Sequence, residues 1–194
     1  TYAFYKTSGS MFNPVLTGIL MLSRSINSIK AIISIIAQII GSLLGAGLAT
    51  MIWNSSIKAE KDHLLYPKMD SKALLSAAIL EGVGMMMVCL TYFCCLINLR
   101  GPKFVSGAAI GGAYLTFKAA FGPKSGGAFN FTEILGPTLF HSVSLNDWPY
   151  YGIGHIVGSV CAWAAWEGFL KDYGKSRMDD EEEEEPATEM GEPD

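Results

Sequence analysis

Residues 8–15 read SGSMFNPV, and residues 125–133 repeat this pattern in altered form as SGGAFNFTE. Both stretches read Ser-Gly-x-x-Phe-Asn, and each opens an apolar segment, 13–22 or 130–143, that is too short to cross a bilayer. Non-helical backbone at membrane depth is tolerated only where it is buried in protein or lines a cavity. The repeat therefore predicts two re-entrant half-helices that meet near the membrane midplane, as in a pore or the remnant of one.

The chain also has four longer apolar segments, which are residues 30–53, 73–98, 104–121 and 149–170. A membrane-spanning helix needs about 20 mostly apolar residues, and the last three of these segments carry one charged residue each. The alternative, a soluble helical bundle, is disfavoured by this length and by the scarcity of charge. We therefore expect an all-α, integral, multi-pass membrane protein that has the lipid bilayer as a partner.

The charges of the chain are unevenly distributed. Half of the residues are hydrophobic and the mean hydropathy is +0.30. Residues 1–178 hold all 14 basic residues against 8 acidic ones, a net charge of +6, whereas residues 179–194 hold ten acidic residues and no basic one. Such an acidic run is typically disordered and solvated. We expect a membrane domain over residues 1–172 and an acidic disordered tail over residues 173–194; binding of a partner by the tail is the alternative.

The sequence offers no pattern for catalysis or for binding a cofactor. Its four cysteines lie inside apolar segments and lack the spacing of zinc ligands: Cys89, Cys94, Cys95 and Cys161. We find no nucleophile with a neighbouring base and no glycine loop suited to a phosphate. The expectations are therefore no enzyme, no cofactor, no metal and no nucleic-acid partner.

Two stripes of small residues are predicted to bring helices into close contact. They are Gly41-x-x-x-Gly45, with Ser42 and Ala46 beside it, and Gly154-x-x-x-Gly158. Small side chains let helix backbones approach closely when lipid supplies no hydrophobic drive between helices.

The order and spacing of these elements resemble those of the aquaporins and glycerol channels, the major intrinsic proteins. The resemblance extends to about residue 170. Residues 8–15 look like the first signature of that family, with Val15 in place of its usual Ala, and residues 130–137 look like the second signature. Residues 38–46 look like its third spanning helix.

Two further positions belong to this resemblance. Glu81 stands where the fourth helix of the family carries a buried Glu, which implies that it bonds to loop backbone and supports a half-helix. His155 stands on the sixth helix, at a position that is usually Pro. Because it lies on a glycine-rich face, we expect it to be a packing residue.

The resemblance implies an aquaporin-like helical bundle with two re-entrant half-helices. It also implies two spanning helices before the first signature, and this chain begins about where the second of them should end. We expect either that an N-terminal part is missing here or that another chain supplies it, because the pore of the family cannot be assembled from these residues alone. Family members are commonly tetramers, so we expect a homo-oligomer or a subunit of a larger membrane complex.

In the family, an Asn caps each half-helix and turns its amide toward passing solute, and a Pro follows because the first helical position does not need its N–H. The first copy here consists of Asn13, Pro14 and Val15, and the second of Asn130, Phe131 and Thr132. The second copy thus keeps the cap and loses the Pro. We expect that the side chain of Phe131 is bulky enough to block the midplane.

The filter residues depart further from the family. Glu133 stands where the family has its filter Arg, and Lys118 falls where water channels often carry His. Gly127 leaves the space beside them open. We predict an ion pair between Lys118 and Glu133 that closes the former filter, since a charge at membrane depth needs a partner. Glu133 is also placed to act in a capping box with Asn130, and Lys118 has the alternative of extending to the membrane interface.

Two functions remain open at this point. One is a divergent channel for water or small neutral solutes with a degenerate filter. The other is a non-conducting structural or scaffold subunit of a membrane assembly, which keeps the fold after losing the filter. The usual activity of the family favours the channel, and the altered residues favour the scaffold.

Overall fold

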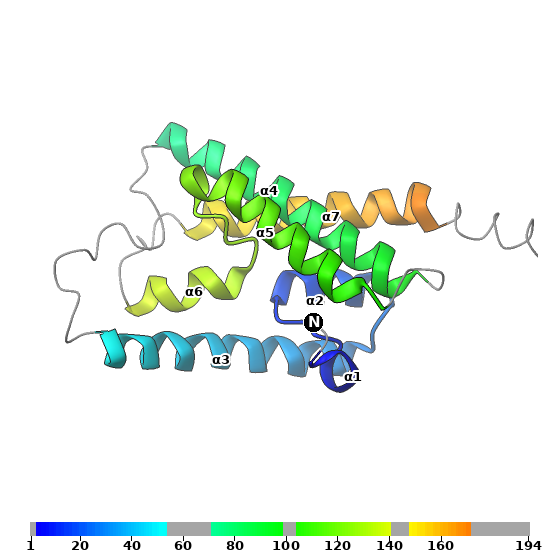
Figure 1. Cartoon of the computed structure of the whole chain (residues 1–194), viewed down its shortest axis with the longest axis horizontal. Helices are drawn as coiled ribbons and strands as arrows, with labels where there is room; N and C mark the ends of the chain where they lie inside the picture. The colour runs from blue at the N-terminus through cyan, green and yellow to red at the C-terminus, as the bar shows by residue number, and fades with distance from the viewer. Residues whose placement is uncertain (1–2, 54–70, 99–103, 141–147, 172–194) are drawn as a thin grey trace, which may run out of the picture.

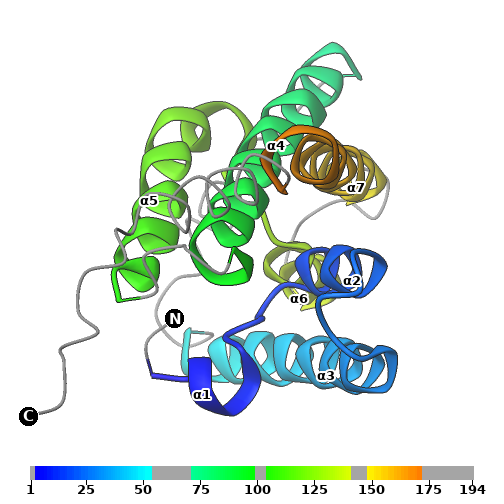
Figure 2. The same cartoon turned by 90° about the vertical axis from the view of Figure 1, so that its right-hand side faces the viewer.

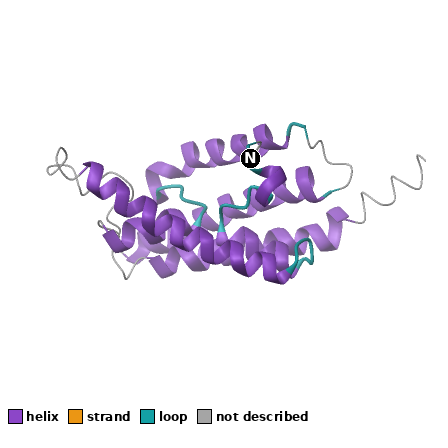
Figure 3. Ribbon diagram, turned by 90° about the horizontal axis from the view of Figure 1, so that it is seen from below, coloured by secondary structure: helices purple, strands orange, loops and turns teal. Residues whose placement is uncertain are grey.

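The computed structural model describes residues 3–53, 71–98, 104–140 and 148–171, and every regular element in this part is helical (Figure 3). In chain order the elements are α1 (Tyr5–Ser8), α2 (Pro14–Leu22), α3 (Ser28–Trp53), α4 (Ser71–Tyr92), α5 (Ser106–Ser125), α6 (Phe131–Phe140) and α7 (Trp148–Ala165). Two short π-helices, Phe93–Ile97 and Trp166–Leu170, continue α4 and α7. The predicted all-α architecture is confirmed.

The helices lie in three layers (Figures 1 and 2). Helices α4, α5 and α7 form one outer layer, in which α4 packs against both neighbours. Helices α2 and α6 form the middle layer, and α3 covers their other side. The short helices are therefore enclosed between long ones, as re-entrant segments must be if their loops are to be shielded from lipid.

Helices α2 and α6 begin near the middle of the molecule and run outward in opposite directions (Figure 1). Their lengths are 9 and 10 residues, which at about 1.5 Å per residue is roughly half the hydrocarbon thickness of a bilayer. This is the predicted pair of half-helices. The second was expected to extend to residue 143, and its last three residues lie outside the described part.

All four predicted spans form long helices. Ser28–Ile52 and Ala73–Ile97 are long and apolar enough, by length and composition, to cross a membrane. Helix α5 has 20 residues, and α7 has 18 before its π-helical extension of 5, so both have sufficient length.

Helices α4 and α7 are in close backbone contact through the second small-residue stripe. A Cβ on Gly158 would lie 2.0 Å from the carbonyl oxygen of Gly82, and one on Gly154 would lie 2.3 Å from that of Ala78. Only hydrogen fits in this space, so the predicted contact is present at Gly154 and Gly158. In the π-helical continuations of these two helices, the rings of Phe93 and Trp166 stack with their centroids 5.4 Å apart.

The first stripe makes its contact through different residues than expected. Gly41 and Gly45 are exposed, and a Cβ on either would meet nothing within 4 Å in the described part of the chain. The contact is made by their neighbours Ser42 and Ala46, which receive Gly136 of α6. The expectation that the two glycines themselves pack against a helix is corrected accordingly, and the reason is the rotation of α3 about its axis.

The acidic tail predicted over residues 173–194 lies outside the described residues, and so do two of the three histidines of the chain, His63 and His141.

Candidate functional site

The two repeated loops share left-handed backbone at the same two positions. Positive φ angles occur at Gly9 (74°) and Ser10 (57°), and at the matching positions Gly126 (93°) and Gly127 (62°). Left-handed backbone at these two steps turns the chain sharply before each half-helix. The internal repeat in the sequence is therefore also a repeat in structure.

Each half-helix is capped by its own Asn. The Oδ1 atom of Asn13 accepts from the backbone N–H of Val15 at 3.1 Å, with Pro14 at the first helical position. The Oδ1 atom of Asn130 accepts from the N–H of Thr132 at 3.1 Å and from its hydroxyl at 2.8 Å. Two of the N–H groups that a helix start leaves unpaired are thereby satisfied.

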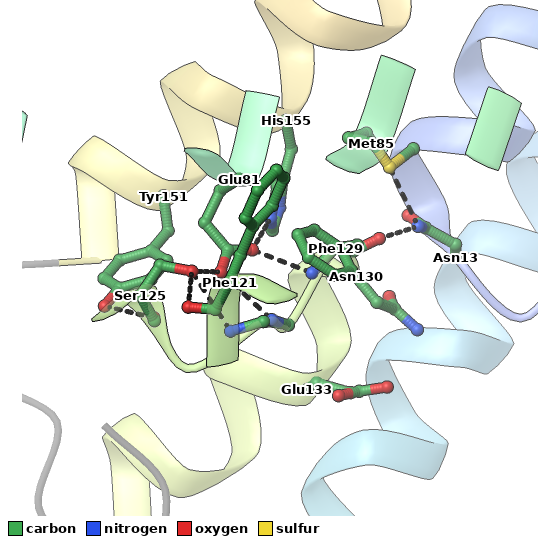
Figure 4. A network of polar contacts seen from close by, with 12 residues as sticks. Asn13, Glu81, Met85, Phe121, Ser125, Phe129, Asn130, Glu133, Tyr151 and His155 are labelled. Carbon is green, nitrogen blue, oxygen red and sulfur yellow. Dashed lines mark hydrogen bonds and ion pairs between the residues drawn. The ribbon is translucent and has the colours of Figure 1, made fainter. Parts of the chain in front are cut away.

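The same two amides tie the half-helices to each other. Asn13 Nδ2 donates to the carbonyl oxygen of Phe129 at 2.7 Å (Figure 4). Asn130 Nδ2 donates to the carbonyl oxygen of Phe12 at 2.9 Å. Both Asn side chains are buried. Two helix N-termini, each carrying partial positive charge, are thus held together at the centre of the molecule. One of the two N–H donors of each amide is thus engaged with a protein carbonyl.

Phe129 is held in a conformation that a bulky residue rarely adopts. Its φ is +47°, which costs of order 1–3 kcal/mol. Its N–H donates to Glu81 at 2.8 Å, its carbonyl accepts from Asn13, and its fully buried ring lies against Gly84. These surrounding contacts offset the strain.

Glu81 is the acceptor that organises the second loop (Figure 4). Its Oε1 accepts from Ser125 Oγ at 2.7 Å and from the N–H of Ala128 at 3.1 Å, and its Oε2 accepts from the N–H of Phe129. The expected support of a half-helix by Glu81 is present. A contact that the sequence did not predict joins it: His155 Nε2 lies 2.9 Å from Glu81 Oε2. His155 is buried, as expected of a packing residue, but its contact with Glu81 gives it a role beyond packing.

Lys118 and Glu133 form the predicted ion pair. Lys118 Nζ lies 2.7 Å from Glu133 Oε2, and the two side chains are 48% and 41% exposed. Gly127 lies directly beside Lys118, since a Cβ there would be 3.1 Å from Lys118 Cα. The structure thus joins Lys118 to both of the other filter-like residues, and the space beside Gly127 that was expected to be open is occupied by Lys118. The capping-box role of Glu133 stays a prediction.

Phe131 lies differently from the expectation. Its ring packs edge-on against Trp148, with centroids 5.6 Å apart, and lies 3.4 Å from the position of a Cβ on Gly152. Both partners belong to α7. The expected block of the midplane by Phe131 is corrected to a packing contact with α7. An aromatic residue at this position has a packing partner that its local sequence does not reveal.

Several residues of the site escaped the sequence analysis. Tyr114 Oη lies 3.5 Å from Asn13 Nδ2, and Met85 Sδ lies 3.4 Å from it. The Tyr92 hydroxyl donates to the carbonyl of Gly9 at 2.6 Å, and that of Tyr151 donates to the carbonyl of Ser125 at 2.9 Å. In the sequence, each of these residues is marked only by a polar atom in an otherwise apolar helix. Gln38 on α3 likewise donates to the carbonyl of Met11.

The described residues hold no group of three or more His, Cys, Asp or Glu side chains arranged for a metal ion. The arrangement is instead one of helix ends, backbone carbonyls and one exposed ion pair, which suits passage or exclusion of a solute.

Comparisons with known proteins agree with this geometry. The sequence model of the family described as Major intrinsic protein matches residues 1–174. Among similar proteins are "Probable aquaporin-5" of Gibberella zeae, 23% identical over 83% of this chain and 28% of that protein, and "Aquaporin A" of Dictyostelium discoideum, 28% identical over 83% and 58%. "Glycerol uptake facilitator protein-like 6" of Lactiplantibacillus plantarum is 28% identical over 83% of this chain and 76% of its own length.

This chain spans little more than a quarter of the length of the first of these relatives and just over half of the second. The match still covers almost the entire chain, and it includes both half-helices with their capping asparagines. The chain belongs to the major intrinsic protein family, whose members are integral, multi-pass membrane proteins.

Proposed function

We propose that the protein is a channel for water or small neutral solutes whose path runs past the two half-helix N-termini. The observation that carries this proposal is the reciprocal pair of hydrogen bonds that joins Asn13 to Phe129 and Asn130 to Phe12. It juxtaposes two positive helix ends, whose field disfavours the passage of cations and protons. Family membership and relatives with the printed names aquaporin and glycerol uptake facilitator support the same activity.

We propose further that the Lys118–Glu133 pair is a degenerate filter that acts as a weak gate. The pair joins α5 to the start of α6 and carries no net charge. An ion pair with half-exposed side chains is worth about 0–1 kcal/mol, which corresponds to at most about fivefold in a population. Such a pair restricts a path without sealing it.

The second candidate is a non-conducting structural subunit of a membrane assembly. It is favoured by one observation: one N–H of each asparagine amide already donates to a backbone carbonyl, so only the second N–H of each group can accompany a solute through the midplane. A solute that took the place of either carbonyl would leave it buried without its donor, which costs about 1–3 kcal/mol.

We extend the proposal to the domains, the oligomeric state and the absence of catalysis. Residues 1–172 form the membrane domain, and residues 173–194 form an acidic, solvated tail. The protein acts as a homo-oligomer, a tetramer by family resemblance, or as one subunit of a larger complex. It has no catalytic activity, in keeping with a family of channels.

The deciding experiment is the osmotic shrinkage rate of lipid vesicles that contain the complete native protein. The native protein is compared with the double variant Lys118→Ala, Glu133→Ala. The matched control is Lys171→Ala, Glu167→Ala, which removes a pair of similar exposure, 45% and 34%, with a length of 2.9 Å on the continuation of α7.

A channel with a weak gate predicts shrinkage faster than that of empty vesicles, a severalfold further gain for the filter variant, and no change for the control. If folded native protein and folded filter variant both shrink at the lipid rate, the channel proposal fails and the structural subunit is favoured.

A further inference from the structure

The carboxylate of Glu81 accepts from four groups, two at each oxygen. Ser125 Oγ and the N–H of Ala128 approach Oε1, and the N–H of Phe129 and His155 Nε2 approach Oε2. A carboxylate has about four lone-pair sites, so this set of contacts fills its capacity. Three of the four groups belong to the second loop or the end of α5 just before it. The fourth, His155, comes from α7.

The protonation of His155 follows from its surroundings. Both His155 and Glu81 are fully buried, with 0% exposed side chains. The other ring nitrogen, Nδ1, has no hydrogen-bond partner among the described residues. A buried N–H without an acceptor is costly, so the geometry places the donor hydrogen on Nε2 rather than on Nδ1. With its hydrogen there, His155 is a hydrogen-bond donor to Glu81.

The rest of the site depends on the orientation of this carboxylate. Glu81 fixes the N–H of Phe129, and the carbonyl of Phe129 is the acceptor for Asn13. Asn130, which caps α6, follows directly. A chain of contacts therefore runs from His155 through Glu81 to the point where the two half-helices meet (Figure 4).

We infer that His155 is a positioning residue for the second half-helix: its Nε2–H orients the Glu81 carboxylate, and the carboxylate keeps the Ala128–Phe129 backbone closed against the first half-helix. The resemblance gives Pro at this position, and Pro has neither this donor nor a side chain that reaches a neighbouring helix. The inference deepens the proposed function, because it names what stabilises the proposed path, but its test does not require transport.

The test is amide hydrogen exchange on the full chain in lipid nanodiscs. Three variants are compared with the native protein. His155→Leu removes the donor at similar volume, and His155→Gln keeps an amide donor. Ser159→Ala is the matched control, because Ser159 is also buried on α7 and its hydroxyl donates to Ile156 of its own helix.

His155→Leu is expected to accelerate exchange at the amides of Ala128 and Phe129 about tenfold or more, as loss of a hydrogen bond to a charged group implies. Exchange at Val15 and Leu16, at the start of the first half-helix, should change much less. His155→Gln should remain within about threefold of native, and Ser159→Ala should leave these amides unchanged. Equal exchange in His155→Leu and native protein would overturn the inference, as would an equal effect at both half-helices.

A measurement on the unsubstituted protein tests whether His155 is a donor to Glu81, even where the leucine variant does not fold. The chain has three histidines, and ¹⁵N-labelled imidazole signals are assigned to His155 by their absence in His155→Gln. A protonated Nε2 and an unprotonated Nδ1 are expected. An Nε2 without a bonded proton would show that His155 accepts from Glu81, and the inferred orientation by a donor would be wrong. Neither measurement depends on transport, so a protein that conducts nothing can still confirm the positioning role.

Discussion

Asn13 Nδ2 lies 2.7 Å from the carbonyl oxygen of Phe129, a residue 116 positions further along the chain. The partner bond from Asn130 to Phe12 has the same form. Each Asn therefore does two things at once: its oxygen caps its own half-helix and its nitrogen fastens the loop of the other half. This double use gives both asparagines a structural role, whereas Val15 and Phe131 stand where the resemblance gives Ala and Pro.

The first prediction concerns this double use. Asn13→Ala should lower the free energy of unfolding by about 2–4 kcal/mol, because it removes a cap and leaves the buried carbonyl of Phe129 without a donor. The control is Asn27→Ala, which removes a cap at the start of α3, where Oδ1 accepts from the exposed N–H of Ile29 at 2.8 Å. The control should cost about 1 kcal/mol or less. Chemical denaturation in bicelles measures both, and equal losses would contradict a cross-linking role for Asn13.

The second prediction concerns the sign of charge at the filter. In Lys118→Glu or Glu133→Lys alone, two like charges face each other, which should separate α5 from α6 and raise osmotic permeability by up to about fivefold. In the double exchange Lys118→Glu, Glu133→Lys, the ion pair is restored with reversed polarity, and permeability should return to within about twofold of native. Vesicle shrinkage measures all three variants. If the double exchange is as permeable as either single variant, pairing does not control the path.

The third prediction concerns the small-residue stripes. Gly158→Ala should destabilise the protein by about 3 kcal/mol, because its Cβ would lie 2.0 Å from a backbone carbonyl that cannot move without separating α4 from α7. Gly41→Ala is the matched control: its Cβ would meet nothing within 4 Å, and alanine is the better helix former by about 0.5–1 kcal/mol. Denaturation of the two variants should thus give opposite signs. A loss of stability in Gly41→Ala comparable to that in Gly158→Ala would show that α3 has a partner on its exposed side.

The elements of this fold are largely readable from local sequence. Asn followed by an apolar run predicts a capped helix wherever it occurs, and both half-helices begin where this rule places them. The pairing of Lys118 with Glu133 was also predictable, because two opposite charges in a scarcely charged membrane segment have few other partners. Glu81 was identified through family resemblance, which supplies a spatial relationship that the chain order alone does not contain.

The errors share one cause, which is the rotation of a helix about its axis. Local sequence placed Phe131 correctly at the first turn of α6 but did not reveal that its ring turns toward Trp148. Because this rotation is not fixed by local sequence, the sequence also did not reveal that His155 lies close to Glu81. It also assigned to Gly41 a contact that belongs to Ser42, one position along α3. A shift of one residue rotates a helical side chain by about 100°, and periodicity fixes this rotation only where one face is clearly polar.

The last prediction tests how tightly the strained residue Phe129 is held. A Cβ on Gly84 would lie 2.1 Å from the Phe129 ring, so Gly84→Ala should cost about 1–3 kcal/mol through overpacking. Phe129→Ala alone should cost about 3–5 kcal/mol because it empties a fully buried site. In the double variant the new methyl group enters the space that the ring has left, so the combined loss should not exceed that of Phe129→Ala.

Gly111→Ala on α5, where a Cβ meets nothing within 4 Å, controls for the helix-forming preference of alanine. Chemical denaturation of the four variants completes the double-mutant cycle. Additive losses at Gly84 and Phe129 would mean that the ring does not depend on this contact, and that its backbone strain is offset by the hydrogen bonds to Glu81 and Asn13 alone.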